Sequence, residues 1–369
     1  MSRTRKYEYH QVVNQLVPAA VSAAMSWSRR LVSARVLRAV LLGATPQLVA
    51  GIALLALLPA GVAAPADPPV ATAASGERSG IATNNPDGVS AIDDAGRRVH
   101  LSSPARRVIT LSPALTEMVF AAGGGSRLVG TVEYSNYPPE ALALPRIGDA
   151  LALQMERILS LEPDLILAWQ RGNNPRQLER LADLGLPIYY SDVARLEDVA
   201  STLERLGVLL ASSSQGAADA YRRRLAALGP QAPSPTAVAT PAVNSPPIRV
   251  FYQVWAQPLM TVNRRHVIND LIERCGGVNV FAGEPLLVPV INVEAAVATA
   301  PEAIIASARG AAPEDGASLA QWRRYGSLPA VAGGFLFLVD SDSISRATPR
   351  ILEAGEAICK HLAQVRRAK

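Results

Sequence analysis

Short runs of β-branched and other apolar residues alternate along the chain with segments whose apolar residues recur every three or four positions. The first pattern is typical of buried strands and the second of helices that pack on a sheet. We expect strands at 107–111, 128–132, 165–169 and 187–190, with helices at 112–122, 155–160 and 174–184. This repeated alternation predicts βαβ units and a parallel sheet.

The same alternation returns in the last third of the chain. We expect strands at 249–254, 303–306 and 334–339, with helices at 267–275, 293–299, 319–325 and 349–366. Between the two halves, residues 196–228 form one long, mostly helical stretch. The pattern therefore predicts an α/β protein with two Rossmann-like lobes joined by a single long helix.

The first 66 residues are typical of an export signal. Four arginines, the last of them Arg38, precede an apolar run at 39–64, and the small residues around Ala64 fit a cleavage site. Met25 is a plausible start, and the pair Arg29-Arg30 hints at the twin-arginine route. The alternative is a retained membrane anchor.

Composition sets the remaining boundaries. We expect a leader at 1–66, a disordered segment and lead-in at 67–105, an N-terminal lobe at 106–195, a connecting helix region at 196–229, a Pro/Ala-rich linker insertion at 230–247 and a C-terminal lobe at 248–369.

The net charge of +5 comes from the leader. Residues 1–66 hold seven of the 36 basic side chains and one of the 31 acidic ones. The rest therefore holds 29 basic and 30 acidic side chains, a net of −1. A nearly neutral body gives no electrostatic reason to expect nucleic acid as a partner.

The two cysteines, Cys275 and Cys359, lie far apart in the sequence. In an exported chain they are candidates for a disulfide, with two separate buried thiols as the alternative. Because histidines and cysteines do not cluster, we expect no zinc or other metal site.

Catalytic motifs are missing. The four histidines are scattered, and the triglycine 123–125 lacks the Lys-Ser/Thr of a phosphate loop. Ser112 stands at a strand-to-helix turn but lacks the G-x-S-x-G context of a hydrolase nucleophile. We therefore expect no catalytic residue, and a hydrolase or a pure scaffold is a minor alternative.

Aromatic and charged residues follow several of the expected strands, where open parallel sheets bind ligands. Flat aromatic rings suit a planar, partly apolar ligand. Each aromatic taken alone is also compatible with a core or rim position, and the two charged residues with a local ion pair. The set comprises Tyr134, Tyr137, Trp169, Trp255, Asp342 and Arg346.

Residues 107–190 resemble the periplasmic cobalamin-binding proteins of bacterial ABC importers. The matching segments are RVITLSPALTEMVFAAG, LVGTVEYSNYPPEA, MERILSLEPDLILAWQRGN and RQLERLADLGLPI. The second half agrees more loosely, through ERCGGVNVF, VEAAVATAPEAII and RATPRILEAGEAIC. The resemblance implies a class III periplasmic binding protein: two lobes joined by one helix, which as a monomer delivers a corrinoid to an inner-membrane ABC permease with its ATPase.

The resemblance also implies roles for individual residues. The disulfide joins Cys275 to Cys359. Glu156 and Glu294 dock into arginine pockets on the permease, although helix N-terminal acids stabilised by the dipole are the alternative. The resemblance implies that Tyr134, Trp169, Asp342 and Arg346 contact the ligand. With the other candidates of the expected cleft, the predicted ligand-binding set is Ala114, Tyr134, Tyr137, Trp169, Trp255, Met260, Asp342 and Arg346.

The sequence departs from the family in its aromatic residues. Family tryptophans fall at Ala150 and Val288 here, a phenylalanine at Met260, and aromatics of the contacting loop at Ser343 and Ile344. Haem is therefore the alternative ligand, because Tyr137-Pro138 matches the context of an iron-ligating tyrosine. A siderophore is a weaker alternative, since the cleft shows no Arg/Lys cluster. The ligand is cargo, so we expect no resident cofactor.

Overall fold

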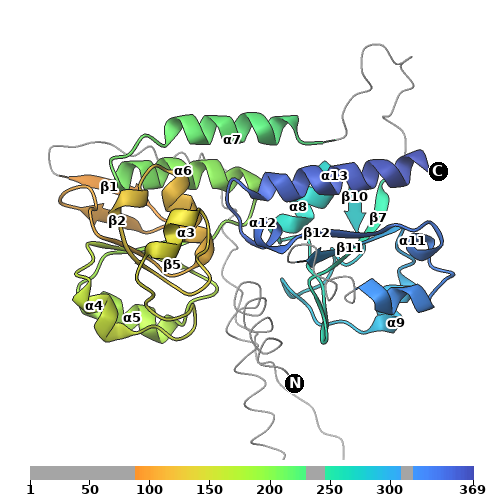
Figure 1. Cartoon of the computed structure of the whole chain (residues 1–369), viewed down its shortest axis with the longest axis horizontal. Helices are drawn as coiled ribbons and strands as arrows, with labels where there is room; N and C mark the ends of the chain where they lie inside the picture. Colours follow the sequence, from red (N-terminus) through yellow and green to blue (C-terminus); the bar gives the residue numbers. More distant parts are fainter. Residues whose placement is uncertain (1–87, 230–245, 309–318) are drawn as a thin grey trace, which may run out of the picture. The chain divides into compact units, whose positions relative to one another are not determined.

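The structure is a computed structural model that describes residues 88–229, 246–308 and 319–369 (Figure 1). These residues belong to one compact unit. The predictions for the leader, for 67–87 and for 230–245 lie outside the described residues. Among the helices that are described, none is both long and apolar enough to cross a membrane.

The N-terminal lobe is built on a parallel sheet of strand order β4-β3-β5-β6. Every residue of β3 is buried, as are four of the five in β5, because the helices α3, α4 and α5 and the connecting segments cover this sheet. The strands are β3 (Val108–Thr110), β4 (Leu128–Thr131), β5 (Leu165–Trp169) and β6 (Ile188–Ser191), and the helices are α3 (Pro113–Ala121), α4 (Met155–Ser160) and α5 (Pro175–Asp183), with 3-10 turns η1 (Gly125–Arg127) and η2 (Pro139–Ala143).

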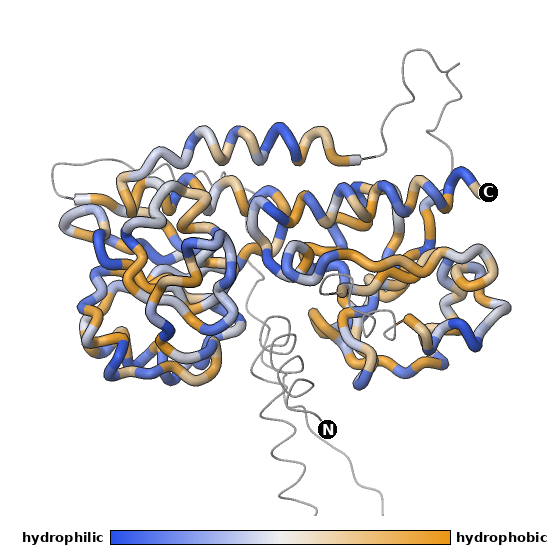
Figure 2. Tube along the Cα trace, in the orientation of Figure 1, coloured by the Kyte–Doolittle hydropathy of each residue, from blue (hydrophilic) through white to orange (hydrophobic). Residues whose placement is uncertain are grey.

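The C-terminal lobe repeats this plan with a parallel sheet of order β10-β7-β11-β12. Figure 2 shows β11 and β12 as largely hydrophobic. The strands are β7 (Ile248–Gln253), β10 (Gly277–Asn279), β11 (Ala303–Ala308) and β12 (Leu336–Asp340), with a hairpin of β8 (Trp255–Ala256) and β9 (Leu259–Met260). The helices are α8 (Val267–Arg274), α9 (Val293–Ala298), α11 (Pro329–Ala332), α12 (Ser341–Ser345), α13 (Ile351–Arg367) and the 3-10 turn η4 (Gln321–Arg324).

In both lobes the first strand of the parallel sheet, β3 or β7, is second in the sheet order, so the next two strands of that sheet along the chain lie on opposite sides of it. Such switch points open a crevice at the carboxyl ends of the strands. The predicted α/β class and parallel sheets are confirmed, and the sheet order places one such crevice in each lobe.

The connection between the lobes differs from the prediction of one continuous helix. It consists of α6 (Leu196–Leu209) and α7 (Gln215–Ala227), which pack side by side (Figure 1). The break contains Ala211 at a φ of 44° and a run of three serines, a residue type that favours turns and caps. A Cβ on Gly207 would lie 1.9 Å from Ser214 Oγ, so glycine permits the close approach of the two helices.

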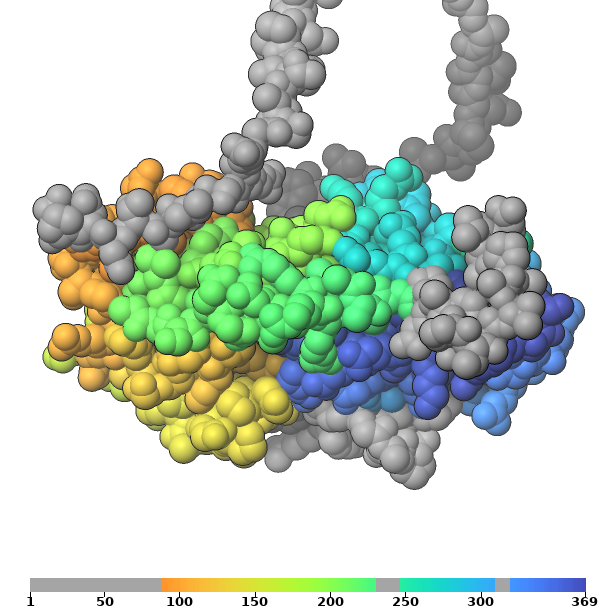
Figure 3. Space-filling model, turned by 90° about the horizontal axis from the view of Figure 1, so that it is seen from above, coloured from red at the N-terminus to blue at the C-terminus, as the bar shows by residue number. Residues whose placement is uncertain are grey.

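Helix α7 lies on the surface beside C-terminal residues (Figure 3). Arg224 on α7 pairs with Glu356 on α13 at 2.9 Å. Helix α7, the second half of the connection, therefore also contacts the C-terminal lobe through this ion pair.

The segment expected to be a lead-in at 67–105 contains two strands, β1 (Val89–Ile92) and β2 (Arg98–Leu101), paired antiparallel. Their burial alternates, with one face against the core. Four-residue strands carry too little pattern to stand out in a sequence. The expected contacting loop around Ser343 and Ile344 is also different, because these residues lie in the helix α12, which begins at Ser341 with Asp340 as its N-cap.

Both lobes share one hydrophobic cluster. It contains buried side chains of α3 and α6 together with those of α8 and α13, such as Met118, Leu203, Leu271 and Ile358. The outer face of each sheet has its own separate cluster. Because a packed core resists sliding, this shared cluster favours small lobe motions over a wide hinge.

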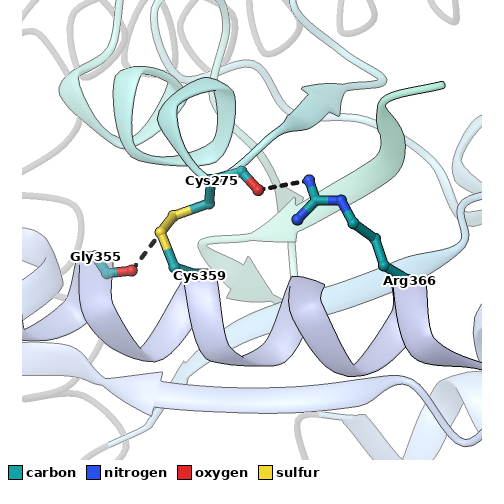
Figure 4. Close-up of a disulfide and its surroundings, with 4 residues drawn as sticks. All are labelled: Cys275, Gly355, Cys359 and Arg366. Atoms are coloured by element: carbon teal, nitrogen blue, oxygen red, sulfur yellow. Dashed lines mark hydrogen bonds between the residues drawn. A yellow bond between two sulfur atoms is a disulfide. The ribbon is translucent and has the colours of Figure 1, made fainter. Parts of the chain in front are cut away.

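The predicted disulfide Cys275–Cys359 is present, with the two Cα atoms 4.6 Å apart (Figure 4). Cys275 ends α8 and Cys359 lies within α13. Arg366 Nη2 donates a hydrogen bond to the carbonyl oxygen of Cys275 at 2.7 Å. The bond therefore fastens two helices of the same lobe.

Candidate functional site: a cleft lined by both lobes

A cleft of about 110 Å³ is lined by residues of both lobes. The N-terminal lobe contributes the segments that follow β3, β5 and β6. The C-terminal lobe contributes residues before α8 and after α12. The lining residues are Ser112, Pro113, Ala114, Leu115, Met118, Trp169, Arg171, Ser191, Asp192, Val193, Ala194, Arg265, His266, Val267, Leu287, Ser345, Arg346 and Ala347.

Trp169, the last residue of β5, is held in place by its neighbours. Its backbone N–H donates to Asn173 Oδ1 at 2.7 Å, and Asn173 Nδ2 donates to the carbonyl oxygens of Leu111 and Ala150 at 2.9 Å. A Cβ on Gly172 would lie 1.7 Å from the indole ring. Glycine at this position therefore leaves the space that the tryptophan occupies.

Two arginine side chains of the cleft, Arg171 after β5 and Arg265 before α8, already donate hydrogen bonds to acceptors within the protein. Arg171 Nε donates to both carboxylate oxygens of Asp192, at 2.7 and 2.6 Å. Arg265 Nη2 donates to the carbonyl oxygen of Pro285 at 2.6 Å. The charge of Arg171 is therefore balanced by that of Asp192. The remaining walls of the cleft are mainly apolar.

His266 is a cleft residue that sequence patterns do not single out. It is 9% exposed and forms the N-cap of α8, where its Nδ1 accepts the N–H of Ile268 at 3.2 Å. Burial, together with the positive charge of Arg171, lowers the pKa of His266 from 6.5 to about 4. The imidazole is therefore neutral at ordinary pH. The signal in the sequence is a histidine directly before a helical segment.

A buried ionic group, here called the interlobe cluster, joins the lobes beside the cleft. Arg346 is 1% exposed, and its Nη1 donates to Glu117 Oε1 at 2.6 Å and to Asn136 Oδ1 at 2.7 Å. Arg346 Nη2 lies 3.2 Å from Asp342 Oδ1 and donates to the carbonyl oxygen of Tyr134 at 3.3 Å. The cluster comprises Glu117, Asn136, Asp342, Arg346, Thr348 and Arg350.

Glu117 on α3 is the only carboxylate that the N-terminal lobe contributes to this cluster among the described residues. Its carboxylate accepts from Thr348 Oγ1 at 3.0 Å and from Arg350 Nη1 at 3.3 Å. Burial raises the pKa of Glu117, while the guanidinium groups of Arg346 and Arg350 and the hydroxyl of Thr348 oppose that rise. The carboxylate thus depends on donors of the other lobe for its stabilisation.

Three of the predicted ligand-binding residues line the cleft: Ala114, Trp169 and Arg346. The guanidinium of Arg346 is, however, turned into the interlobe cluster. Asp342 also belongs to that cluster and accepts from Asn136 Nδ2 at 3.1 Å. The local ion pair weighed for Asp342 and Arg346 is therefore present, but it forms part of a larger contact between the lobes.

The other predicted ligand-binding residues do not line the cleft. Tyr134 contributes its carbonyl oxygen to the interlobe cluster and has a φ of 66°. Tyr137 is 42% exposed, with the Arg350 guanidinium carbon 4.0 Å from its ring centroid. Trp255 donates through Nε1 to the carbonyl oxygen of Gln257, and Met260, opposite it in the hairpin, is buried at 4% exposure. In this structure Met260 is a packing residue.

Glu156 and Glu294 occupy equivalent places in the two lobes. Each lies in the first turn of a six-residue helix, α4 in one lobe and α9 in the other, and each is exposed. Within the part of the chain that the structure describes, neither carboxylate forms an ion pair at 4.0 Å or less. Both are thus accessible to a partner.

Among the described residues, no group of three or more histidine, cysteine or acidic side chains is placed to hold a metal ion. Ser112 Oγ accepts the N–H of Leu115 as the N-cap of α3. The cleft has features that suit the binding of a small molecule: apolar walls, a held tryptophan and a few oriented polar groups.

The model of the family described as "Periplasmic binding protein" matches residues 108–343. This chain belongs to the periplasmic binding protein family. Of the curated relatives of this periplasmic binding protein, the vitamin B12-binding protein of Vibrio parahaemolyticus is 36% identical over 270 residues, which cover 73% of this chain and 93% of the relative.

A solved structure gives the same comparison in three dimensions. The periplasmic vitamin B12 binding protein BtuF of Vibrio cholerae superposes on this periplasmic binding protein with a TM-score of 0.62, at 34% identity. The match covers 71% of this chain and 98% of that chain. A periplasmic haem-binding protein from Pseudomonas aeruginosa matches at 24% identity and a TM-score of 0.57, covering 69% and 91% of the two chains, and shows the shared fold alone.

Proposed function

We propose that this protein captures cobalamin, or a related corrinoid, in the cleft between its lobes and delivers it to an ABC importer. The observation that carries this proposal is the match to vitamin B12-binding proteins over almost their entire length, at 36% identity. The cleft supports it, because residues that follow strands of one lobe meet residues of the other across a mainly apolar space.

The size of the cleft indicates where the ligand lies. The cleft is about 110 Å³ in volume, which is small beside the roughly 300–1,000 Å³ of most ligand pockets. We therefore expect a corrinoid to extend beyond the cleft toward its open side. We expect Trp169 to pack against the macrocycle, and the interlobe cluster to yield slightly as the cleft widens.

Delivery requires a surface that the importer recognises. Glu156 and Glu294 are exposed, and each belongs to a different lobe. We propose that they contact basic pockets of the permease, so that the spacing of the two carboxylates reports the separation of the lobes. Charge reversal at either position should weaken delivery and leave corrinoid binding unchanged.

Residence in the periplasm and a transport role without catalysis complete the proposal. The disulfide fits an oxidising compartment. Ser112, the nucleophile candidate, accepts a hydrogen bond from Leu115 N–H as a helix cap, which supports a structural role.

Titration calorimetry of purified residues 67–369 with cyanocobalamin tests the proposal. We expect a 1:1 complex, and a visible spectrum of the retained corrinoid after gel filtration. Parallel titration with haemin separates the alternative ligand, because a bound haem gives a Soret band. Absence of cobalamin binding at tens of micromolar, or tighter binding of haemin, contradicts the proposal.

A further inference from the structure

His266 occupies an unusual position, because one side of its ring caps a helix and the residue also lines the cleft. Its Nδ1 accepts the N–H of Ile268, the second residue of α8. A nitrogen that accepts a backbone N–H carries a lone pair there and no proton. A neutral imidazole has one N–H, so in His266 that proton resides on Nε2.

The Nε2–H group has no protein acceptor among the residues that the structure describes, although the side chain is only 9% exposed. In the free protein, solvent in the cleft can serve as acceptor. When a ligand displaces that solvent, a buried donor without a partner weakens binding, so an acceptor must come from the ligand. The nearby donors Arg171 and Arg265 already bond to Asp192 and to Pro285.

We propose that Nε2–H of His266 donates a hydrogen bond to a carbonyl or carboxylate oxygen of the bound ligand, and so selects ligands that present such an oxygen at this side of the cleft. This inference rests on the proposed function, since corrinoids carry amide side chains around their macrocycle. The same tautomer disfavours His266 as a ligand of cobalt or iron, because a metal needs the lone pair of Nε2, which here carries the proton.

The lowered pKa of His266 supports this assignment, since a protonated ring has a second N–H on Nδ1 and cannot cap α8. The positive charge of Arg171 and the burial of the ring both favour the neutral form. The donor is therefore oriented by the fold before a ligand arrives, because the capping bond fixes which side of the ring faces the cleft.

Two variants separate the hydrogen bond from the cap and from packing. His266→Asn keeps a good N-cap but withdraws the ring, whereas His266→Phe keeps a ring of similar shape but loses cap and donor. We expect both, once shown to be folded by circular dichroism, to bind cyanocobalamin about two- to tenfold more weakly than the wild type. Wild-type affinity in either folded variant overturns the proposal.

A measurement on the unaltered protein covers the case in which a variant does not fold. Nitrogen-15 NMR of the histidine side chains should show Nδ1 unprotonated and Nε2 protonated, and the Nε2–H signal should move on addition of cyanocobalamin. A protonated Nδ1, or an unmoved signal in a saturated complex, overturns the inference. If the wild type binds no cobalamin at all, the proposed function fails instead, and the calorimetry shows this directly.

Discussion

Two interactions hold the C-terminal helix α13 in place, and they differ in chemistry: the disulfide and the interlobe cluster, here called its two fastenings. In its middle, Cys359 joins α13 covalently to Cys275 at the end of α8, within one lobe. At its start, Arg350 reaches across to Glu117 of the other lobe through polar contacts alone. The permanent bond lies inside a lobe, and the reversible bonds lie between lobes. A cleft that must admit and release a ligand requires that arrangement.

The two fastenings should therefore respond differently to mutation. The disulfide stabilises mainly by restricting the unfolded chain, so its loss should lower stability without changing the cleft. The interlobe cluster contributes only when the lobes are correctly apposed, so its loss should change both stability and binding. Four changes, from the largest expected effect to the smallest, test this difference.

Glu117→Ala should have the largest effect. It leaves the buried guanidinium of Arg346 without its main anion, and breaking a buried ion pair in this way costs about 3–5 kcal/mol. We expect that loss in urea unfolding, together with weaker cobalamin binding in calorimetry. Glu117→Gln is the matched control, because it keeps an acceptor of the same shape and should lose less. Stability within 1 kcal/mol of wild type for the alanine variant would contradict an interlobe role.

Replacing both Cys275 and Cys359 by alanine should cost about 2–4 kcal/mol in the same unfolding experiment, since the bond closes a loop of 84 residues. Cobalamin affinity should stay within about twofold of wild type, because neither cysteine lines the cleft. Chemical reduction of the wild-type protein provides the matching control. If affinity falls as much as in the Glu117 variants, the proposed division between the two fastenings is wrong.

Lowering the pH should test how much His266 contributes to stability. This residue caps the end of α8 at the cleft, and the disulfide lies at the other end of the same helix. The folded pKa of His266 is about 4 and its unfolded value about 6.5, so the unfolded chain binds the extra proton in that window. Stability should therefore be fully present above pH 6.5 and fall by about 2–3 kcal/mol as the pH drops toward 4. The difference between wild type and His266→Asn isolates this contribution, and parallel pH curves for the two would refute it.

Gly172→Ala should have the smallest effect on stability and a selective effect on binding. The new methyl group must displace the Trp169 ring, which lies 1.7 Å from the position of its Cβ. We expect cobalamin affinity to fall several-fold, up to about tenfold, with a shift in tryptophan fluorescence. Gly216→Ala is the control, because its Cβ would meet no atom within 4 Å. An equal loss of affinity in both variants would argue against a positioning role for Gly172.

Local sequence features were sufficient to predict most of the strands and helices of the two lobes. Runs such as 165–169 and 188–191 are apolar enough to be recognised as strands, and Ser112-Pro113 marks the start of α3. The break in the connecting helix was missed, because a run of serines and one alanine at positive φ carry only a weak signal. The four-residue strands of the first hairpin were missed for a similar reason: each is too short for its periodicity to be read.

The amino-acid order by itself determined the α/β class, the two parallel sheets and the position of Trp169 at a strand end, because these depend on residues close together in the chain. The pairing of Cys275 with Cys359, which are 84 positions apart, was implied by the resemblance to a known family. Only the tertiary structure decided that Arg346 meets Glu117, 229 positions away, rather than facing a ligand. It also decided that His266 lines a cleft. Such contacts depend on how two separately formed sheets pack against shared helices, and no local pattern encodes that packing.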